Sequence, residues 1–177
     1  MRILRGILIR MKAIVLSILL ISVVSVGAQN LEDGWKGILP LKATKADVEK
    51  AYGPPTDIDD NLYYMYIGEG YNVQINYSTE PCKANRYSRG KYNIPKDTVL
   101  DMWVSLKGNV LLSSVKFDRS KFTRRPDEEL TNLVHYYRGD IGMTITSEMR
   151  DKEGNEYLGR VIYRPPSTPD PNVICPK

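Results

Sequence analysis

Residues 61–78, NLYYMYIGEGYNVQINYS, decide the fold class of this chain. Two runs rich in aromatic and β-branched residues, 61–67 and 71–78, flank the glycine loop Gly68-Glu69-Gly70, which is typical of a β-hairpin. In the second run apolar or aromatic residues alternate with polar ones, starting from Tyr71 and Asn72. This period of two predicts an antiparallel strand with one buried face and one face open to water or to a partner.

A short helix is predicted before the hairpin, at about 43–52. Thr44 suits the N-cap position, and Asp47 lies three residues later, where an acid faces the positive end of the helix. Gly53 and the two prolines that follow it predict an abrupt end.

Further strands and one more helix are predicted after the hairpin. Apolar residues alternate along 99–107 and leave Trp103 on the opposite, polar side of that strand. Pro126, followed by three acids, is typical of a helix start, and this helix is expected to end near Leu133. The remaining strands are predicted at 110–117, 143–150 and 156–164. Five prolines predict an extended tail at 165–177.

Together these elements predict an α+β fold, with short helices packed on an antiparallel sheet in a single domain at 29–164. Residues 62–75 are similar to residues 133–145, since a glycine and an acid follow the aromatic segment in each. Two explanations are open. Either a helix-plus-hairpin unit is used twice, in halves 29–82 and 98–164, or two hairpins are similar by chance.

The first 28 residues have the pattern of a signal peptide. Basic residues precede the apolar run 13–26, and Val26-Gly27-Ala28 offers the small residues that a signal peptidase accepts. We expect cleavage before Gln29, with a retained anchor as the alternative, and Met11 as an alternative start to Met1. No cysteine follows the apolar run, so a bacterial lipid anchor is not expected.

The net charge of +4 disappears with this segment. Residues 1–28 hold four basic residues and no acid, which leaves 21 basic and 21 acidic residues in the remainder. The net charge therefore gives no argument for binding nucleic acid or an anionic membrane.

The chain has two cysteines, Cys82 and Cys175. Export to an oxidising compartment predicts that they pair, which closes a long loop. Two buried free thiols are the alternative. A catalytic thiol is disfavoured because neither cysteine has a CxxC or thiol–histidine context.

The run Thr44-x-x-x-Val48-x-x-x-x-Gly53-x-Pro55, followed by an aromatic hairpin, resembles the SmpA/OmlA (BamE-like) envelope proteins and the β-lactamase-inhibitor-like fold over residues 37–77. This resemblance implies helices packed on an antiparallel sheet and a role in binding proteins at the bacterial envelope. The chain as a whole is similar to uncharacterised exported bacterial proteins with the signatures GI-x-PL, GPP and a C-terminal CP.

The sequence offers little catalytic chemistry. His135 is the single histidine and no G-x-S-x-G motif is present, so we interpret His135 as structural. One histidine and two paired cysteines make no zinc set, and the acidic clusters at 57–60 and 151–156 do not match a calcium loop. We therefore expect no metal and no cofactor. A pair of carboxylates acting as a glycosidase stays open, because such a pair needs no local motif.

The loop 83–96 holds five basic residues, two tyrosines and no acid. Arginine and tyrosine bind phosphates, carboxylates or acidic protein surfaces. A solvated loop held by Cys82 is the plainer interpretation. Trp35 and Trp103 are further interface candidates. The candidate binding residues are Arg86, Tyr87, Arg89, Lys91, Tyr92, Trp35 and Trp103.

We expect a periplasmic or extracellular protein that acts as a non-catalytic binding module. Its expected partner is a protein or an anionic envelope polymer, without nucleic acid and without a membrane span after cleavage. A small hydrolase of cell-wall or extracellular glycans is the first alternative, and a purely structural envelope protein is the second.

Overall fold

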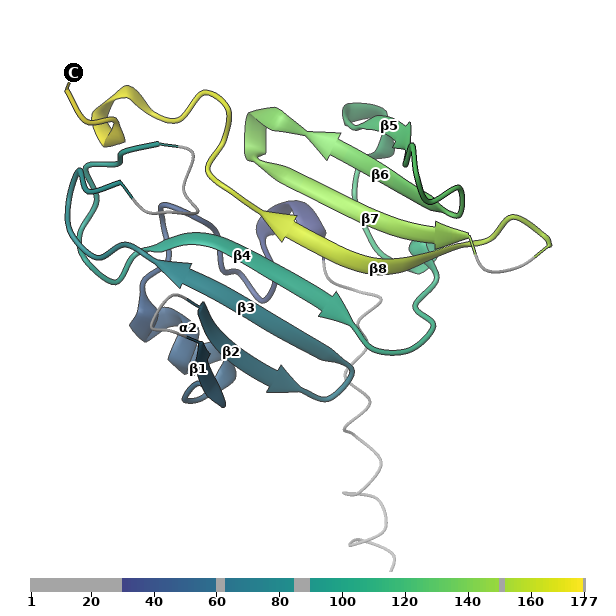
Figure 1. Cartoon of the computed structure of the whole chain (residues 1–177), viewed down its shortest axis with the longest axis horizontal. Helices are drawn as coiled ribbons and strands as arrows, with labels where there is room; N and C mark the ends of the chain where they lie inside the picture. Colours follow the sequence, from purple (N-terminus) through teal and green to yellow (C-terminus); the bar gives the residue numbers. More distant parts are fainter. Residues whose placement is uncertain (1–29, 60–62, 85–89, 150–151, 177) are drawn as a thin grey trace, which may run out of the picture.

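A computed structural model describes residues 30–59, 63–84, 90–149 and 152–176. These residues form one α-helix, α2 (Lys45–Tyr52), and one eight-stranded antiparallel sheet with the order β1-β2-β3-β4-β8-β7-β6-β5 (Figure 1). The strands are β1 (Asp57–Asp59), β2 (Tyr63–Gly68), β3 (Tyr71–Tyr77), β4 (Val99–Leu106), β5 (Thr123–Pro126), β6 (Leu133–Arg138), β7 (Met143–Met149) and β8 (Glu156–Tyr163). The short 3-10 helices are η2 (Leu31–Asp33), η3 (Leu112–Ser114), η4 (Arg119–Lys121), η5 (Gly139–Ile141) and η6 (Pro171–Val173).

The sheet consists of two four-stranded halves. Strands β1 to β4 pair in chain order, strands β5 to β8 do the same, and β4 joins β8 through pairs such as Met102 with Tyr163. The two hairpins that are similar in sequence, β2–β3 and β6–β7, hold equivalent places in these halves. Within the described residues the second half has no counterpart of α2, so only the strand arrangement recurs.

Helix α2 confirms the helix predicted before the hairpin. The Asp47 backbone N–H donates to Thr44 Oγ1 at 3.3 Å, and the Thr44 N–H donates back to Asp47 Oδ2 at 2.8 Å. This reciprocal capping box satisfies two backbone donors at the helix start. Gly53 ends the helix with φ of 82°, and Val48 is fully buried against the sheet.

The predicted helix from Pro126 to Leu133 is wrong. Pro126 ends strand β5, and the next residues form a turn. The Asp127 carboxylate accepts the backbone N–H groups of Glu129 at 2.9 Å and Leu130 at 2.8 Å. The Asp127 N–H donates to the Leu133 carbonyl at 3.0 Å, which closes the β5–β6 hairpin. Asp127, which would suit the first turn of a helix, instead accepts the backbone N–H groups of the β5–β6 turn.

The predicted strand at 110–117 is also wrong. The segment contains η3 and pairs with the sheet through one isolated β-bridge, between Leu111 and Tyr157, and one hydrogen bond from the Leu158 N–H to the Val110 carbonyl. Leu112 and Val115 are the buried residues, and their spacing of three matches one turn of 3-10 helix rather than the alternation of a strand.

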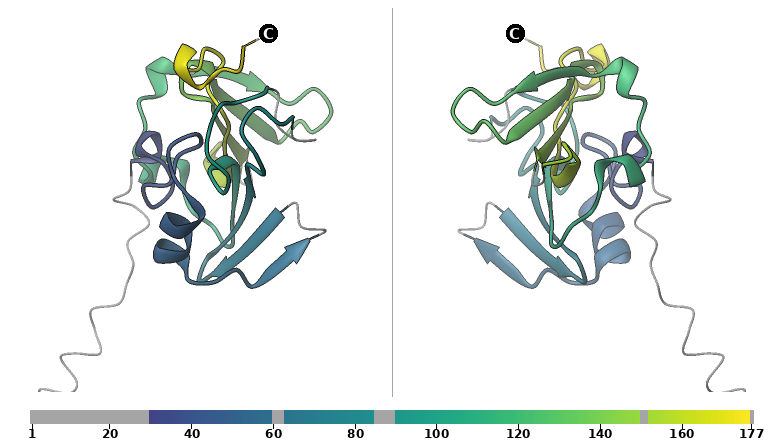
Figure 2. Two further views of the ribbon diagram at one scale, coloured as in Figure 1. Left: turned by 90° about the vertical axis from the view of Figure 1, so that its left-hand side faces the viewer. Right: turned by 90° about the vertical axis from the view of Figure 1, so that its right-hand side faces the viewer.

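Helix α2 and the N-terminal segment cover one face of the sheet (Figure 2), and at one end of the other face tail residues lie beside Asp101. Figure 2 shows α2 and the short N-terminal helix on one side, with both ends of the sheet bending toward the opposite side. The uncovered face is therefore concave. The core lies on the covered face and includes Trp35, Val48, Tyr66, Val73, Ile75, Met102, Val104, Ile145, Val161 and Tyr163.

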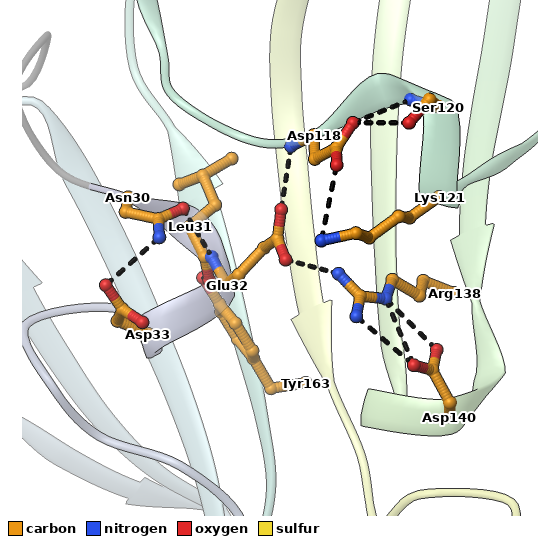
Figure 3. Close-up of polar contacts among 10 residues, drawn as sticks. All are labelled: Asn30, Leu31, Glu32, Asp33, Asp118, Ser120, Lys121, Arg138, Asp140 and Tyr163. Carbon is orange, nitrogen blue, oxygen red and sulfur yellow. Dashed lines mark hydrogen bonds and ion pairs between the residues drawn. The ribbon is translucent and has the colours of Figure 1, made fainter.

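The N-terminal segment is anchored by charge as well as by packing (Figure 3). Arg138 on β6 donates hydrogen bonds to Glu32 in η2 and to Asp140. The second Glu32 oxygen accepts the Asp118 backbone N–H at 2.7 Å, and the buried Tyr163 hydroxyl donates to the Leu31 carbonyl at 2.9 Å. These bonds hold η2 against the second half of the sheet.

Replacing Arg138 by methionine keeps the aliphatic stem but removes the charge that η2 depends on. We expect Arg138→Met to lower the free energy of unfolding by about 1.5–3 kcal/mol, the usual contribution of hydrogen bonds to charged groups. Lys121→Met is the control, because its ion pair with Asp118 is exposed. Urea unfolding measures both variants, and equal losses would contradict the anchoring role of Arg138.

The C-terminal tail contains the 3-10 helix η6 and is docked on the rest of the fold. Cys175 forms a disulfide with Cys82, 93 positions away, and Asn93 donates to the Val173 carbonyl at 2.8 Å. The tail begins beside the start of β7, where the Arg164 N–H donates to the Gly142 carbonyl at 2.8 Å. A side chain at Gly142 would lie 2.0 Å from the Arg164 carbonyl oxygen, so only glycine permits this approach.

The double variant Cys82→Ser/Cys175→Ser tests how far the disulfide holds the fold. Closing a loop of 93 positions contributes about 4–5 kcal/mol in the chain-entropy model, so we expect a loss approaching that size. Urea unfolding measures the loss, and hydrogen exchange locates it. Faster exchange at 165–176 than in β3 is expected, and uniform exchange would contradict local release of the tail.

Candidate functional site

The concave face of the sheet carries two rows of side chains that no helix of the described residues covers. The strand register aligns residues from five or six strands in each row. The first row is Gln74, Trp103, Ile162, Thr144 and Tyr137, and the second is Asn72, Ser105, Arg160, Thr146, His135 and Arg125. We call this surface the concave face.

Trp103 lies at the middle of the concave face, on the side of β4 that the sequence predicts. The guanidinium groups of Arg160 and Arg164 lie 5.6 Å and 5.7 Å from its ring. Both distances are within the range of cation–π attraction. The indole Nε1 is buried and has no hydrogen-bond partner in the part of the chain that the structure describes. A half-buried tryptophan under two arginines is a typical composition for an interface centre.

His135 links the β5–β6 turn to the neighbouring strand. Its Nδ1 lies 3.1 Å from Thr146 Oγ1, and its Nε2 lies 2.9 Å from Asp127 Oδ2. The hydrogen bond from His135, together with backbone N–H groups of Leu130 and Glu129, lowers the pKa of Asp127 to about 2. Both ring nitrogens are engaged, which supports the interpretation of His135 as a structural residue.

A cavity of about 550 Å³ lies near the start of β4, where residues of the C-terminal tail meet the concave face. Its volume is within the range of small-molecule sites. The residues that line it include Lys91, Tyr92, Asp101, Tyr137, Met143, Arg164, Pro165 and Ile174.

Asp101 is the buried charged group of this cavity. Its side chain belongs to the same side of β4 as Trp103, yet the residue is only 4% exposed. Burial raises the pKa of Asp101 to about 6, while the charge of Arg164 and the Asn76 amide act in the opposite direction. Oδ1 of Asp101 has no hydrogen-bond partner within the described residues.

The raised pKa of Asp101 predicts a specific pH dependence. Unfolding releases a proton between about pH 4 and pH 6, so the free energy of unfolding should fall by up to about 3 kcal/mol as the pH rises through this window. Asp101→Asn removes this dependence, while every other titrating group is common to both proteins. Urea unfolding at pH 4 and pH 7 measures the difference, and parallel losses would contradict the prediction.

The structure separates the residues that the sequence predicts as a site. Trp35 is 2% exposed and packs edge-to-face on Tyr71 in the core, so it presents no contact surface. Lys91 and Tyr92 line the cavity, and Trp103 lies on the concave face. The other three predicted residues, Arg86, Tyr87 and Arg89, lie outside the described residues, as does the predicted signal peptide.

Sequence reasoning missed three residues of the site: Asp101, Arg160 and Arg164. Asp101 and Arg160 stand at polar positions of predicted strands, a weak signal that solvent exposure explains equally well. Arg164 borders the tail, and no local pattern shows that the tail turns back over the sheet.

Comparison of the chain with protein-family models, with curated proteins and with solved structures gives no match in any of the three. In the described ranges, none of the helices is both long and apolar enough to span a bilayer. The same ranges contain no cluster of three or more histidine, cysteine or acidic side chains arranged to hold a metal ion.

Proposed function

We propose that this protein is an exported, non-catalytic binding module that contacts an acidic partner through its concave face. The partner is a protein or an anionic polymer of the bacterial envelope. The observation that carries the proposal is Trp103, whose ring is contacted by two arginines in a central strand, on the side of the sheet that α2 does not cover.

The charge of the concave face supports an acidic partner. Arg125, Arg160 and Arg164 contribute positive charge. Of the acids at this face, Asp101 is buried, Asp127 is bound by His135, and Glu148 accepts a hydrogen bond from Asn132. Arginine suits such a surface because its planar guanidinium binds carboxylates and phosphates through two parallel hydrogen bonds. Tyr137, which is 40% exposed, adds an aromatic contact at the β6 end.

The resemblance of residues 37–77 to SmpA/OmlA and inhibitor-like modules supports the same class of function, because those families act by binding. The disulfide between Cys82 and Cys175 supports export, since such bonds persist in oxidising compartments. The apolar segment before Gln29 supports it too.

Site-specific photo-crosslinking tests the proposal. A crosslinking amino acid replaces Ser105 on the concave face, and in a matched control it replaces Ala46, which is exposed on α2. We expect an adduct from position 105 and none from position 46 in cells that make the protein. A single discrete mass indicates a protein partner, and a ladder of masses indicates a polymer.

Charge reversal at Arg125 and Arg160 should reduce the adduct at position 105 by about tenfold or more, as expected for interface arginines. Lys50→Glu on the outer side of α2 is the control and should leave the adduct unchanged. An absent adduct would favour the purely structural alternative. Release of soluble sugars from envelope glycans by the purified protein would favour the hydrolase.

A further inference from the structure

The cavity adjoins the first row of the concave face, with which it shares Tyr137 and Thr144, and it has a different set of charged residues, Asp101, Arg164 and Lys91. Asp101 and Arg164 line it from β4 and the end of β8, and Pro165, Pro166, Ser167, Pro169 and Ile174 line it from the tail. Lys91 and Tyr92 close a third side. The cavity is therefore enclosed by three segments that are far apart in the sequence.

Its walls are fixed by covalent and hydrogen bonds. The disulfide between Cys82 and Cys175 ties the tail to the loop that carries Lys91, and the Cys175 N–H donates to the Lys91 carbonyl at 3.3 Å. At the other end, the Ser167 N–H donates to the Gly139 carbonyl at 2.9 Å. A preformed cavity loses little conformational freedom when a ligand enters.

Asp101 lines this cavity, and one of its carboxylate oxygens lacks a hydrogen-bond partner in the described part of the chain. The residue is only 4% exposed, and its Oδ1 has no hydrogen-bond partner within the described residues. Buried carboxylate oxygens in native proteins are normally paired. A ligand donor, and best of all a cationic one, would supply the missing hydrogen bond.

Arg164 supplies a positive charge to the same cavity. Its positive charge acts on the Asp101 carboxylate, yet the described residues hold no ion pair between Arg164 and any acid. Arg138, whose backbone is also near, is already neutralised by Glu32 and Asp140. The cavity therefore holds an acid with one carboxylate oxygen that lacks a hydrogen-bond partner and, near it, a guanidinium that forms no salt bridge within the described residues.

We infer that this cavity binds a small zwitterion, with an ammonium group on Asp101 and a carboxylate on Arg164. A free α-amino acid has this chemistry, since both charges stand on one carbon. Met143, Pro165 and Ile174 line the remaining surface, which favours an apolar side chain. This inference does not depend on the partner proposed for the concave face.

Calorimetric titration of the mature, disulfide-bonded protein tests the inference. The probes are the twenty standard α-amino acids, followed by two analogues of leucine: N-acetylleucine, which lacks the ammonium group, and leucinamide, which lacks the carboxylate. We expect at least one apolar amino acid to bind, and each leucine analogue to bind at least tenfold more weakly than leucine. No binding by any amino acid up to about 10 mM would overturn the inference.

Two variants assign the charges. Asp101→Asn should weaken leucine binding at least tenfold and leave N-acetylleucine unchanged, and Arg164→Gln should weaken both. Asp59→Asn, an exposed acid on β1, is the control and should bind leucine like the wild type. Circular dichroism confirms folding of each variant. Equal binding by leucine and N-acetylleucine, or wild-type affinity in Asp101→Asn, would overturn the assignment.

The test is independent of the crosslinking experiment. Charge reversal at Arg125 and Arg160 should not change leucine binding, because neither residue lines the cavity. Asp101→Asn should not change the adduct at position 105. If the adduct at position 105 forms and no amino acid binds, the cavity inference fails. If an amino acid binds and no adduct forms, the proposal for the concave face fails.

Discussion

The pairing of β4 with β8 is the constraint on which the rest of the structure depends. It joins two antiparallel halves that are each formed by neighbouring strands, and it is the contact between them within the sheet. Met102, Val104, Val161 and Tyr163 meet at this junction and are almost completely buried. Because both halves contribute to one core, the N-terminal segment can cover a single continuous face: η2 packs on the second half and α2 on the first. The concave face follows from that one-sided cover.

Local signals made half of this architecture predictable. The β2–β3 hairpin has a glycine loop and a strict alternation, and α2 has a capping box and a glycine stop, so each is determined by residues close in sequence. The errors at 110–117 and 126–133 have a common cause. In both segments the residue types predict one secondary structure, and contacts with a distant part of the chain determine another. For Leu112 the contact is burial on the covered face of the sheet, and for Asp127 it is the pairing of β5 with β6.

The candidate site was less predictable than the fold, for a physical reason. The alternation along β4 predicts that the side chains of Asp101 and Trp103 are on the same side of the strand. It does not predict which segments of the chain cover that side. Asp101 is buried because the tail and the loop 90–93 meet above it, and that meeting is specified by the disulfide, by backbone hydrogen bonds and by Gly142. These are contacts of long sequence separation between segments without regular periodicity. A polar residue on an open strand and one at the edge of a cavity have the same sequence pattern.

The same covalent bond connects the compartment of the protein to the shape of its site. The tail carries few apolar side chains, and its docking depends on a handful of hydrogen bonds and on Cys175. In a reducing compartment the tail would be held by those hydrogen bonds alone, and such marginal segments open readily. The disulfide between Cys82 and Cys175 removes that freedom. The disulfide therefore helps to hold the tail residues that line the cavity with Asp101, and the burial that raises the pKa of Asp101 is described for the disulfide-bonded protein.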